Sequence, residues 1–283
     1  MGSRLAVATG VTSGIGHQVA LGLVRQGYDL VVIARNPSKV DALRLEAQAI
    51  RSDANVEAHI ADLSLVGSTQ AAVSAIRERV DRIDLLFLSA GRVPNSLELT
   101  SEGIESTFAI SYLSRVVITE GLLPALMRSE DKLLVVVASP GMNGNVDVDD
   151  INFQKRGYST MKVLGQFQHA NDVYFTQLDA DHAQAGLRTF VYEPGVVDTP
   201  IHDNWPTPLR LMMRYAMWPW TISAERSASI PLEVVAGTLE PTSHLFNSRR
   251  RSLDTPRTVR NADYRQRVVA FSRELISGAA PQG

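Results

Sequence analysis

A short apolar run followed by three closely spaced glycines constrains this chain more than any other feature. Residues 5–8 are small or branched and apolar, as in a buried parallel strand. Gly10, Gly14 and Gly16 follow, and apolar residues then recur at helical spacing from Val19 onward. The glycines therefore lie in a turn from a strand into a helix. The unpaired backbone N–H groups at the start of such a helix face an anion, normally a pyrophosphate.

Each glycine in this turn has its own steric reason. Gly10 adopts a backbone conformation that a side chain would forbid. Gly14 lets the backbone approach a ligand closely, and Gly16 lets the helix pack tightly on the strand. An ordinary structural loop is the alternative, but the strand, the turn and the helix all match a nucleotide-binding turn. We therefore place Ser13 and Ile15, together with the three glycines, in a cofactor-binding loop.

The rest of the chain alternates short apolar strands with helices, without internal repeats or low-complexity linkers. This order predicts an α/β fold, a doubly wound Rossmann-type parallel sheet with helices on both faces. With 283 residues, the chain is expected to form one domain spanning 1–283. Strands are predicted near 4–9, 29–34, 55–60, 84–88, 132–138 and 188–193, and helices near 15–26, 38–52, 66–81, 101–127, 158–185 and 267–276.

Composition excludes several classes of function. The chain has no cysteine, which excludes disulfides, thiolate catalysis and cysteine-ligated metals. Its six histidines are scattered without a ligand pair, so no metal site is expected. A formal net charge of −2 without a basic block argues against nucleic-acid binding. No apolar run reaches the length of a membrane span, and no signal peptide precedes the first strand, so we expect a soluble cytoplasmic protein.

The spacing of the glycine turn, Thr9-Gly-x-x-x-Gly-x-Gly16, resembles that of the short-chain dehydrogenase/reductase family. The resemblance implies a nicotinamide cofactor. Ala34, at the end of the second strand, stands where the family's NAD-preferring members carry the Asp that binds a ribose 2′-hydroxyl. Arg35 could instead pair with a 2′-phosphate, so we expect NADP. A solvated surface arginine is the alternative, and Ser13 replaces the basic residue that the family often adds in the glycine loop.

Three further segments resemble family motifs that contact the cofactor. Asp62 and Leu63 follow the third strand, where the resemblance implies adenine contact; capping of the next helix by Asp62 or Ser64 is the alternative. The small residues 89–91 follow the fourth strand and would let the backbone lie against the cofactor. The segment 194–200 resembles the one that covers the nicotinamide and holds its carboxamide. The residues assigned to the cofactor here are Asp62, Leu63, Ser89, Ala90, Gly91, Pro194, Gly195, Val197 and Thr199.

The family's catalytic positions match this chain only in part. Ser139, after the fifth strand, matches the serine that hydrogen-bonds the substrate oxygen, and Ser111 replaces the Asn that helps hold a proton-relay water. The stretch Val146–Asn152 resembles the retinol-dehydrogenase-like subgroup. The family's chemistry also needs a tyrosine as acid/base and a lysine four residues on, so that both share a helix face and the lysine lowers the phenol pKa. Tyr158 and Lys162 have this spacing.

The distance to the Pro-Gly pair favours a different register. In the family the tyrosine precedes this pair by about thirty residues, the length of a helix, a turn and a strand. Tyr158 precedes Pro194 by 36 residues, whereas Leu164 stands at the family's distance with Gln168 at the lysine position. The difference is not a whole number of helical turns, so an insertion would rotate Tyr158 off the catalytic face. We favour the register of Leu164 and Gln168 and keep Tyr158 with Lys162, in a distorted helix start, as the alternative.

The stretch 201–222 is rich in Trp, Met, Pro and Leu and stands where the family has its variable substrate lid. An apolar lid predicts a hydrophobic small-molecule substrate; a packed helix pair or a membrane-facing patch are the alternatives. The leading interpretation is an NADP-dependent carbonyl reductase or alcohol dehydrogenase, in which Ser139 polarises the carbonyl, Tyr158 donates the proton and Lys162 tunes its pKa. A non-redox cyclase or isomerase of natural-product biosynthesis, using Ser139 and Gln168, is the second. A cofactor-binding protein without catalysis is the third, and a homo-oligomer is allowed for.

Overall fold

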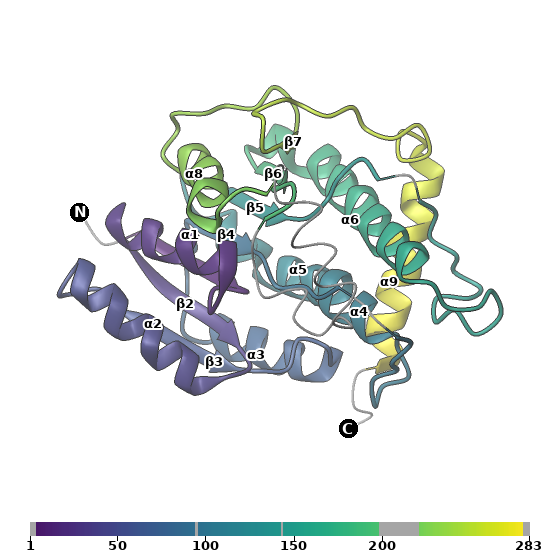
Figure 1. Ribbon diagram of the computed structural model, residues 1–283, viewed down its shortest axis with the longest axis horizontal. Coiled ribbons are helices and arrows are strands. Elements are labelled where there is room, and N and C mark those ends of the chain that lie inside the picture. The colour runs from purple at the N-terminus through teal and green to yellow at the C-terminus, as the bar shows by residue number, and fades with distance from the viewer. Residues whose placement is uncertain (1–3, 94–95, 143, 198–220, 280–283) are drawn as a thin grey trace.

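The computed structural model describes residues 4–93, 96–142, 144–197 and 221–279. Within these ranges the strands form one parallel sheet in the order β3-β2-β1-β4-β5-β6-β7 (Figure 1). Chain order reverses beside β1, which confirms the predicted doubly wound, Rossmann-type fold. The strands are β1 (Arg4–Thr9), β2 (Tyr28–Ala34), β3 (Val56–Ile60), β4 (Leu85–Leu88), β5 (Leu133–Val137), β6 (Arg188–Glu193) and β7 (Leu245–Asn247).

Helices cover both faces of the sheet because side chains of each strand alternate between two apolar layers. Val7 and Val31 belong to one layer, whereas Ala6 and Leu30 belong to the other. The first layer packs against α3 (Val66–Arg77), α5 (Ser114–Leu126), α6 (Thr160–His182) and α9 (Ala262–Ala279). The second packs against α1 (Gly14–Arg25), α2 (Pro37–Ile50) and α8 (Ala224–Val235) (Figure 1).

One helical stretch of the described chain, Ser106–Leu126, is long and apolar enough to span a membrane, with a mean hydropathy of 1.3. This corrects the expectation that no such run exists. It consists of α4 (Ser106–Phe108), a π-helical turn η1 (Ala109–Leu113) and α5. Inside the protein, 72% of its apolar window is buried, and α5 packs on α3. A core helix passes the same test of length and composition, so burial accounts for the hydropathy.

The predicted strands begin and end within one residue of the observed ones, but β7 and α8 were not predicted. Pro231 lies inside α8 and has no N–H to donate to the carbonyl of Ser227 one turn earlier. The hydroxyl of Tyr192, on β6, donates to that carbonyl at 3.0 Å instead. A hydrogen bond from β6 therefore satisfies the carbonyl that Pro231 leaves without its helical donor.

The start of α3 corrects the predicted cap. The N–H groups of Val66 and Gly67 donate to the two carboxylate oxygens of Glu102, at 2.6 and 2.9 Å. Asp62 Oδ1 instead accepts hydrogen bonds from the N–H and the hydroxyl of Ser64, at 2.9 and 2.7 Å. Because Glu102 lies 36 residues beyond Val66, local sequence could not identify it as the cap.

Candidate functional site

The glycine turn lies between β1 and α1 and is closed by contacts between backbone atoms. Gly10 has a φ of +70°, and a Cβ added to it would lie 2.4 Å from the backbone nitrogen of Ala90. A Cβ on Gly16 would lie 2.1 Å from the carbonyl oxygen of Gly10. Both distances are far inside van der Waals contact, so neither position admits a side chain. Gly16 therefore packs against the turn itself, which draws the first turn of α1 close to the end of β4.

The start of α1 is left without a side-chain cap. Its N-cap residue, Ser13, accepts no hydrogen bond from the helix through its side chain, and the first turn of this described helix holds no acidic residue. The next helix differs, because Asn36 Oδ1 accepts a hydrogen bond from the N–H of Lys39 at 3.2 Å. The first N–H groups of α1 and the positive end of its dipole are therefore available to an anion.

The ends of β2 and β3 bring two predicted cofactor contacts to the same edge. Arg35 is exposed directly after β2, and no side chain of the described residues pairs with its guanidinium. Asp62 follows β3, and its N–H donates to Ser68 Oγ at 3.0 Å. Leu63 is buried in the core, so only its backbone is placed to meet a ligand. The carboxyl edge of the sheet thus carries an exposed cation directly after β2.

The segment Ser89–Gly91 lies over a buried arginine that the sequence analysis did not identify. Arg115, on α5, is 4% exposed and donates to the carbonyl oxygens of Ala90 and Val137, at 3.0 and 2.8 Å. It also donates to Asn171 Oδ1 at 3.2 Å, and no carboxylate of the described residues pairs with it. Burial lowers its pKa to about 9. Arg115 therefore ties the ends of β4 and β5 together beneath the site.

Ser111 lies in the π-helical turn η1 and is buried. Its Oγ accepts a hydrogen bond from the N–H of Arg92 at 3.2 Å, and its carbonyl accepts one from the Asn171 amide at 3.1 Å. π-helical turns inside α-helices occur frequently at functional sites. Ser111 thus braces the backbone between the loop after β4 and helix α6, and the water-holding role implied by the resemblance stays a prediction.

Two side chains of α6 hold the loop that follows β5. The N–H of Ser139 donates to Gln168 Oε1 at 2.9 Å, and the N–H of Gly141 donates to Asp172 Oδ2 at 2.8 Å. Gln168 and Asp172 are one helical turn apart and share a face of α6. Asp172 is fully buried, its Oδ1 has no partner among the described residues, and burial raises its pKa to about 7. Gln168 therefore positions Ser139, and Asp172 is a site residue that the sequence analysis missed.

Tyr158 and Lys162 do not share a helix face. The predicted helix 158–185 begins at Thr160, so Tyr158 precedes it, whereas Lys162 is exposed in its first turn. Leu164, which takes the tyrosine position in the favoured register, lies on α6 and packs half-buried against the core. Tyr158 and Lys162 therefore cannot lie one turn apart on a single helix, because the chain is still extended at Ser159.

The hydroxyl of Tyr158 is buried and has no hydrogen-bond partner among the described residues. Its ring packs edge-on against Phe153, with 6.3 Å between ring centroids. Burial raises the pKa of Tyr158 to about 12, nearby Glu105 raises it further, and Arg92 lowers it. The cation that favours ionisation of this phenol is therefore Arg92, where the sequence analysis expected Lys162.

The predicted nicotinamide segment follows β6. The N–H of Gly195 donates to Glu193 Oε1 at 3.1 Å, and Val197 pairs with Ile222 in a parallel bridge. The chain therefore returns to this edge immediately before α8. Thr199 and all but the last two residues of the predicted lid at 201–222 lie outside the described residues.

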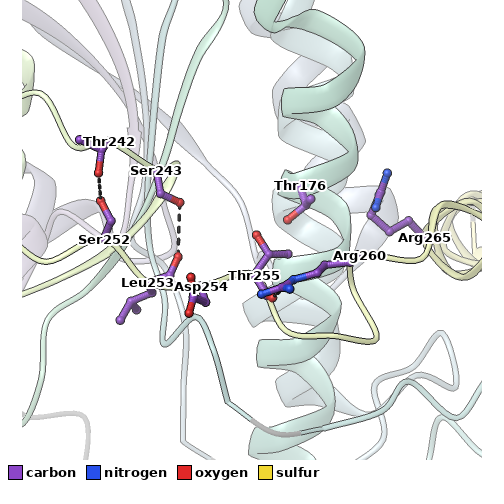
Figure 2. A pocket seen from close by; sticks show the side chains of 9 residues that line it. All are labelled: Thr176, Thr242, Ser243, Ser252, Leu253, Asp254, Thr255, Arg260 and Arg265. Carbon is purple, nitrogen blue, oxygen red and sulfur yellow. Dashed lines mark hydrogen bonds between the residues drawn. The ribbon is translucent and has the colours of Figure 1, made fainter.

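A polar hollow of about 540 Å³ lies between α6 and the segments that lead into and out of β7. Figure 2 shows Thr242 and Ser252 joined by a hydrogen bond of 2.7 Å on one side of it, with Arg260 and Arg265 on the other. Both arginines are already bonded to neighbouring groups. Ser243 precedes β7, so the hollow lies toward the amino end of that strand. Ligands of such sheets bind beyond the carboxyl ends, so this hollow is not part of the candidate site.

Comparison with known proteins gives matches over most of the chain. A family model described as short chain dehydrogenase matches residues 4–209. Retinol dehydrogenase 13 from Homo sapiens is 27% identical over 199 residues, which cover 70% of this chain and 60% of that protein. WW domain-containing oxidoreductase from Drosophila melanogaster is 26% identical over 290 residues, covering 99% of this chain and 70% of that protein. The crystal structure of a variant actinorhodin polyketide ketoreductase with NADPH has a TM-score of 0.67 at 22% identity, covering 87% of this chain and 95% of that one, and shows likeness of fold.

Proposed function

We propose that this chain, which belongs to the short-chain dehydrogenase family, is an NADP(H)-dependent oxidoreductase that reduces a ketone or oxidises an alcohol of a hydrophobic small molecule. The observation that carries the proposal is the glycine turn, closed at Gly10 and Gly16 against backbone atoms and followed by the uncapped start of α1. Relatives named as a retinol dehydrogenase and an oxidoreductase support redox chemistry. This chain spans 60% of the length of retinol dehydrogenase 13.

The residues at the carboxyl edge fit a dinucleotide with a 2′-phosphate. The N–H groups at the start of α1 would bind the pyrophosphate, and the exposed guanidinium of Arg35 would bind the 2′-phosphate through paired, charge-assisted hydrogen bonds. Ala34 offers no acid to a 2′-hydroxyl, which favours NADP over NAD. When bound, the nicotinamide supplies or accepts the hydride at the substrate's carbonyl or alcohol carbon.

Ser139 would bind the substrate's oxygen, and Tyr158 would protonate it. The hydroxyl of half-buried Ser139 would donate a hydrogen bond to that oxygen, and Gln168 fixes the backbone from which it projects. Tyr158 is the candidate proton donor, because its hydroxyl lacks a partner among the described residues and a pKa of about 12 keeps it protonated at neutral pH. A contact between Lys162 and the nicotinamide ribose stays a prediction.

A second candidate function is a non-redox cyclisation or isomerisation on the same scaffold. The observation that favours it is the face of α6 that holds the loop of Ser139. Leu164 cannot exchange a proton, and the Gln168 carboxamide carries no charge. In this function Ser139 would still hold a substrate oxygen, while the pocket selects a reactive conformer.

One assay distinguishes the two functions. The purified protein is offered a panel of apolar ketones with NADPH, and product formation and NADPH loss are followed together. The oxidoreductase proposal expects the two amounts to be equal. Product without NADPH loss supports the second function, and NADPH loss without product would contradict both.

A further inference from the structure

We propose that a basic hollow at the carboxyl ends of β6 and β7 binds the carboxylate or phosphate group of an amphipathic substrate. The hollow has a volume of about 630 Å³. Its role in the reaction rests on the proposed function, whereas its ability to bind an anion does not. The residues that line it include Gly195, Ile222, Ile230, Arg226, Arg249 and Arg250.

The hollow lies beside the segment expected to cover the nicotinamide. Gly195 and Val196 line it directly after β6, and Asn247 lines it at the end of β7. In open α/β sheets, ligands bind beyond the carboxyl ends of the strands, which is where this hollow opens. A molecule bound here would therefore lie next to the reactive end of the cofactor.

Among the described residues that line the hollow, positive charge exceeds negative charge. Arg226 and Arg249 line it, and no carboxylate of the described residues pairs with either guanidinium. Arg250 also lines it but is neutralised by Glu233, whose oxygens lie 2.6 and 2.8 Å from its Nη2. Glu193, the remaining carboxylate among the described lining residues, accepts the N–H of Gly195 at 3.1 Å. The hollow therefore favours a negatively charged ligand.

Arg226 lies on α8, whereas the turn that carries Arg249 and Arg250 is held in a costly conformation. Arg250 has a φ of +58°, in the left-handed region that non-glycine residues rarely adopt. Asn247 Oδ1 accepts the N–H groups of Arg249 and Arg251, at 3.0 and 3.1 Å, and so fixes the turn. The ion pair between Arg250 and Glu233 anchors it to α8. Strained turns of this kind are concentrated at ligand sites, and this one presents Arg249 to the hollow.

The apolar part of the lining indicates that the anion belongs to a larger organic molecule. Val196, Ile222 and Ile230 share the hollow with the arginines. Ile230 is already buried, whereas Val196 and Ile222 are partly exposed. A bare inorganic anion would leave the exposed parts of Val196 and Ile222 in water, whereas an alkyl chain next to the charged group would bury them. The two sources of such an oxyanion, a carboxylic acid and a phosphate monoester, both fit this lining.

Calorimetric titration of the protein without cofactor tests the site with octanoate, octyl phosphate and the neutral analogue octanamide. We expect the anions to bind at least about fivefold more tightly than octanamide, since charge-assisted hydrogen bonds exceed neutral ones. Arg226→Gln and Arg249→Gln should each weaken anion binding by about fivefold to tenfold and leave octanamide unchanged. Arg251→Gln is the matched control, because Arg251 is exposed in the same turn and does not line the hollow. The preferred anion identifies the source.

Octanamide binding as tightly as the anions would overturn the site, as would equal losses in Arg251→Gln and Arg249→Gln. Failure of both anions to bind would also overturn it. NADPH titration of the same proteins separates this proposal from the proposed function. Anion binding that depends on Arg226 and Arg249, in a protein that does not bind NADPH, would refute the proposed function and leave the site standing.

Discussion

The glycine turn after β1 and the loop after β5 lie at the same edge of the sheet but are held by different kinds of contact. In the glycine turn, Gly10 and Gly16 pack on backbone atoms. In the loop after β5, side chains of α6 accept the N–H groups of Ser139 and Gly141. Backbone contacts contain no titratable group, whereas the second set includes the buried carboxyl of Asp172. The cofactor end of the site should therefore depend on backbone shape, and the reaction end on side-chain chemistry and pH.

The largest effect is expected at the reaction end, from Tyr158→Phe. If Tyr158 donates the proton, its loss should slow turnover by about 10²–10⁴-fold, the usual contribution of a general acid. Cofactor affinity should stay the same, because the glycine turn is untouched. Steady-state turnover and NADPH titration measure the two quantities separately.

The matched control for this substitution is Tyr174→Phe. The hydroxyl of Tyr174 is also buried without a partner among the described residues, but it lies in the core on α6. Its removal should leave turnover unchanged. Full turnover by Tyr158→Phe would contradict the assignment of Tyr158 as the proton donor. It would favour the register in which Leu164 and Gln168 face the substrate.

At the cofactor end, Gly10→Ala should be the most damaging single substitution. It combines a φ of +70° with a Cβ 2.4 Å from a backbone nitrogen, so we expect a loss of at least about 3 kcal/mol in the free energy of unfolding and loss of NADPH binding. Gly27→Ala is the control, because Gly27 has a φ of +86° and nothing within 4 Å of its Cβ position. Urea unfolding should show a loss of only about 1–2 kcal/mol in the free energy of unfolding of Gly27→Ala. Equal losses would mean that the backbone clash contributes nothing.

Asp172→Asn tests the pH dependence of the reaction end. The pKa of Asp172 is about 7 in the folded protein against an ordinary value of 3.8, so the unfolded chain releases this proton at lower pH. The free energy of unfolding that this group contributes therefore falls as pH rises from about 4 to 7. Between pH 5 and 7 the free energy of unfolding of the unmutated protein should fall by about 2–3 kcal/mol more than that of Asp172→Asn. The asparagine keeps an acceptor for the N–H of Gly141. Urea unfolding at pH 5 and 7 measures both proteins. Equal changes in their free energies of unfolding would contradict the raised pKa of Asp172.

The fold and the shape of the glycine turn could be predicted because they depend on local sequence. Short runs of branched apolar residues fix the strands, and the glycine spacing fixes the turn. The reaction end depends on contacts between distant segments. Arg115 and Asp172 belong to residue types that are usually solvated, and their burial arises only when α5 and α6 pack on the sheet. The start of α6 was also misplaced: the helix was predicted from 158, but the chain is still extended at Ser159 and α6 begins at Thr160.

The central claim, a cofactor site built for NADP(H), is tested most directly by calorimetric titration with NADPH and NADH. We expect NADPH to bind at least about tenfold more tightly, because Arg35 would pair with the 2′-phosphate. In Arg35→Ala the preference should disappear while NADH affinity stays the same, since NADH has no phosphate at that position. Equal affinities of the unmutated protein for the two cofactors, or binding of neither, would contradict the account.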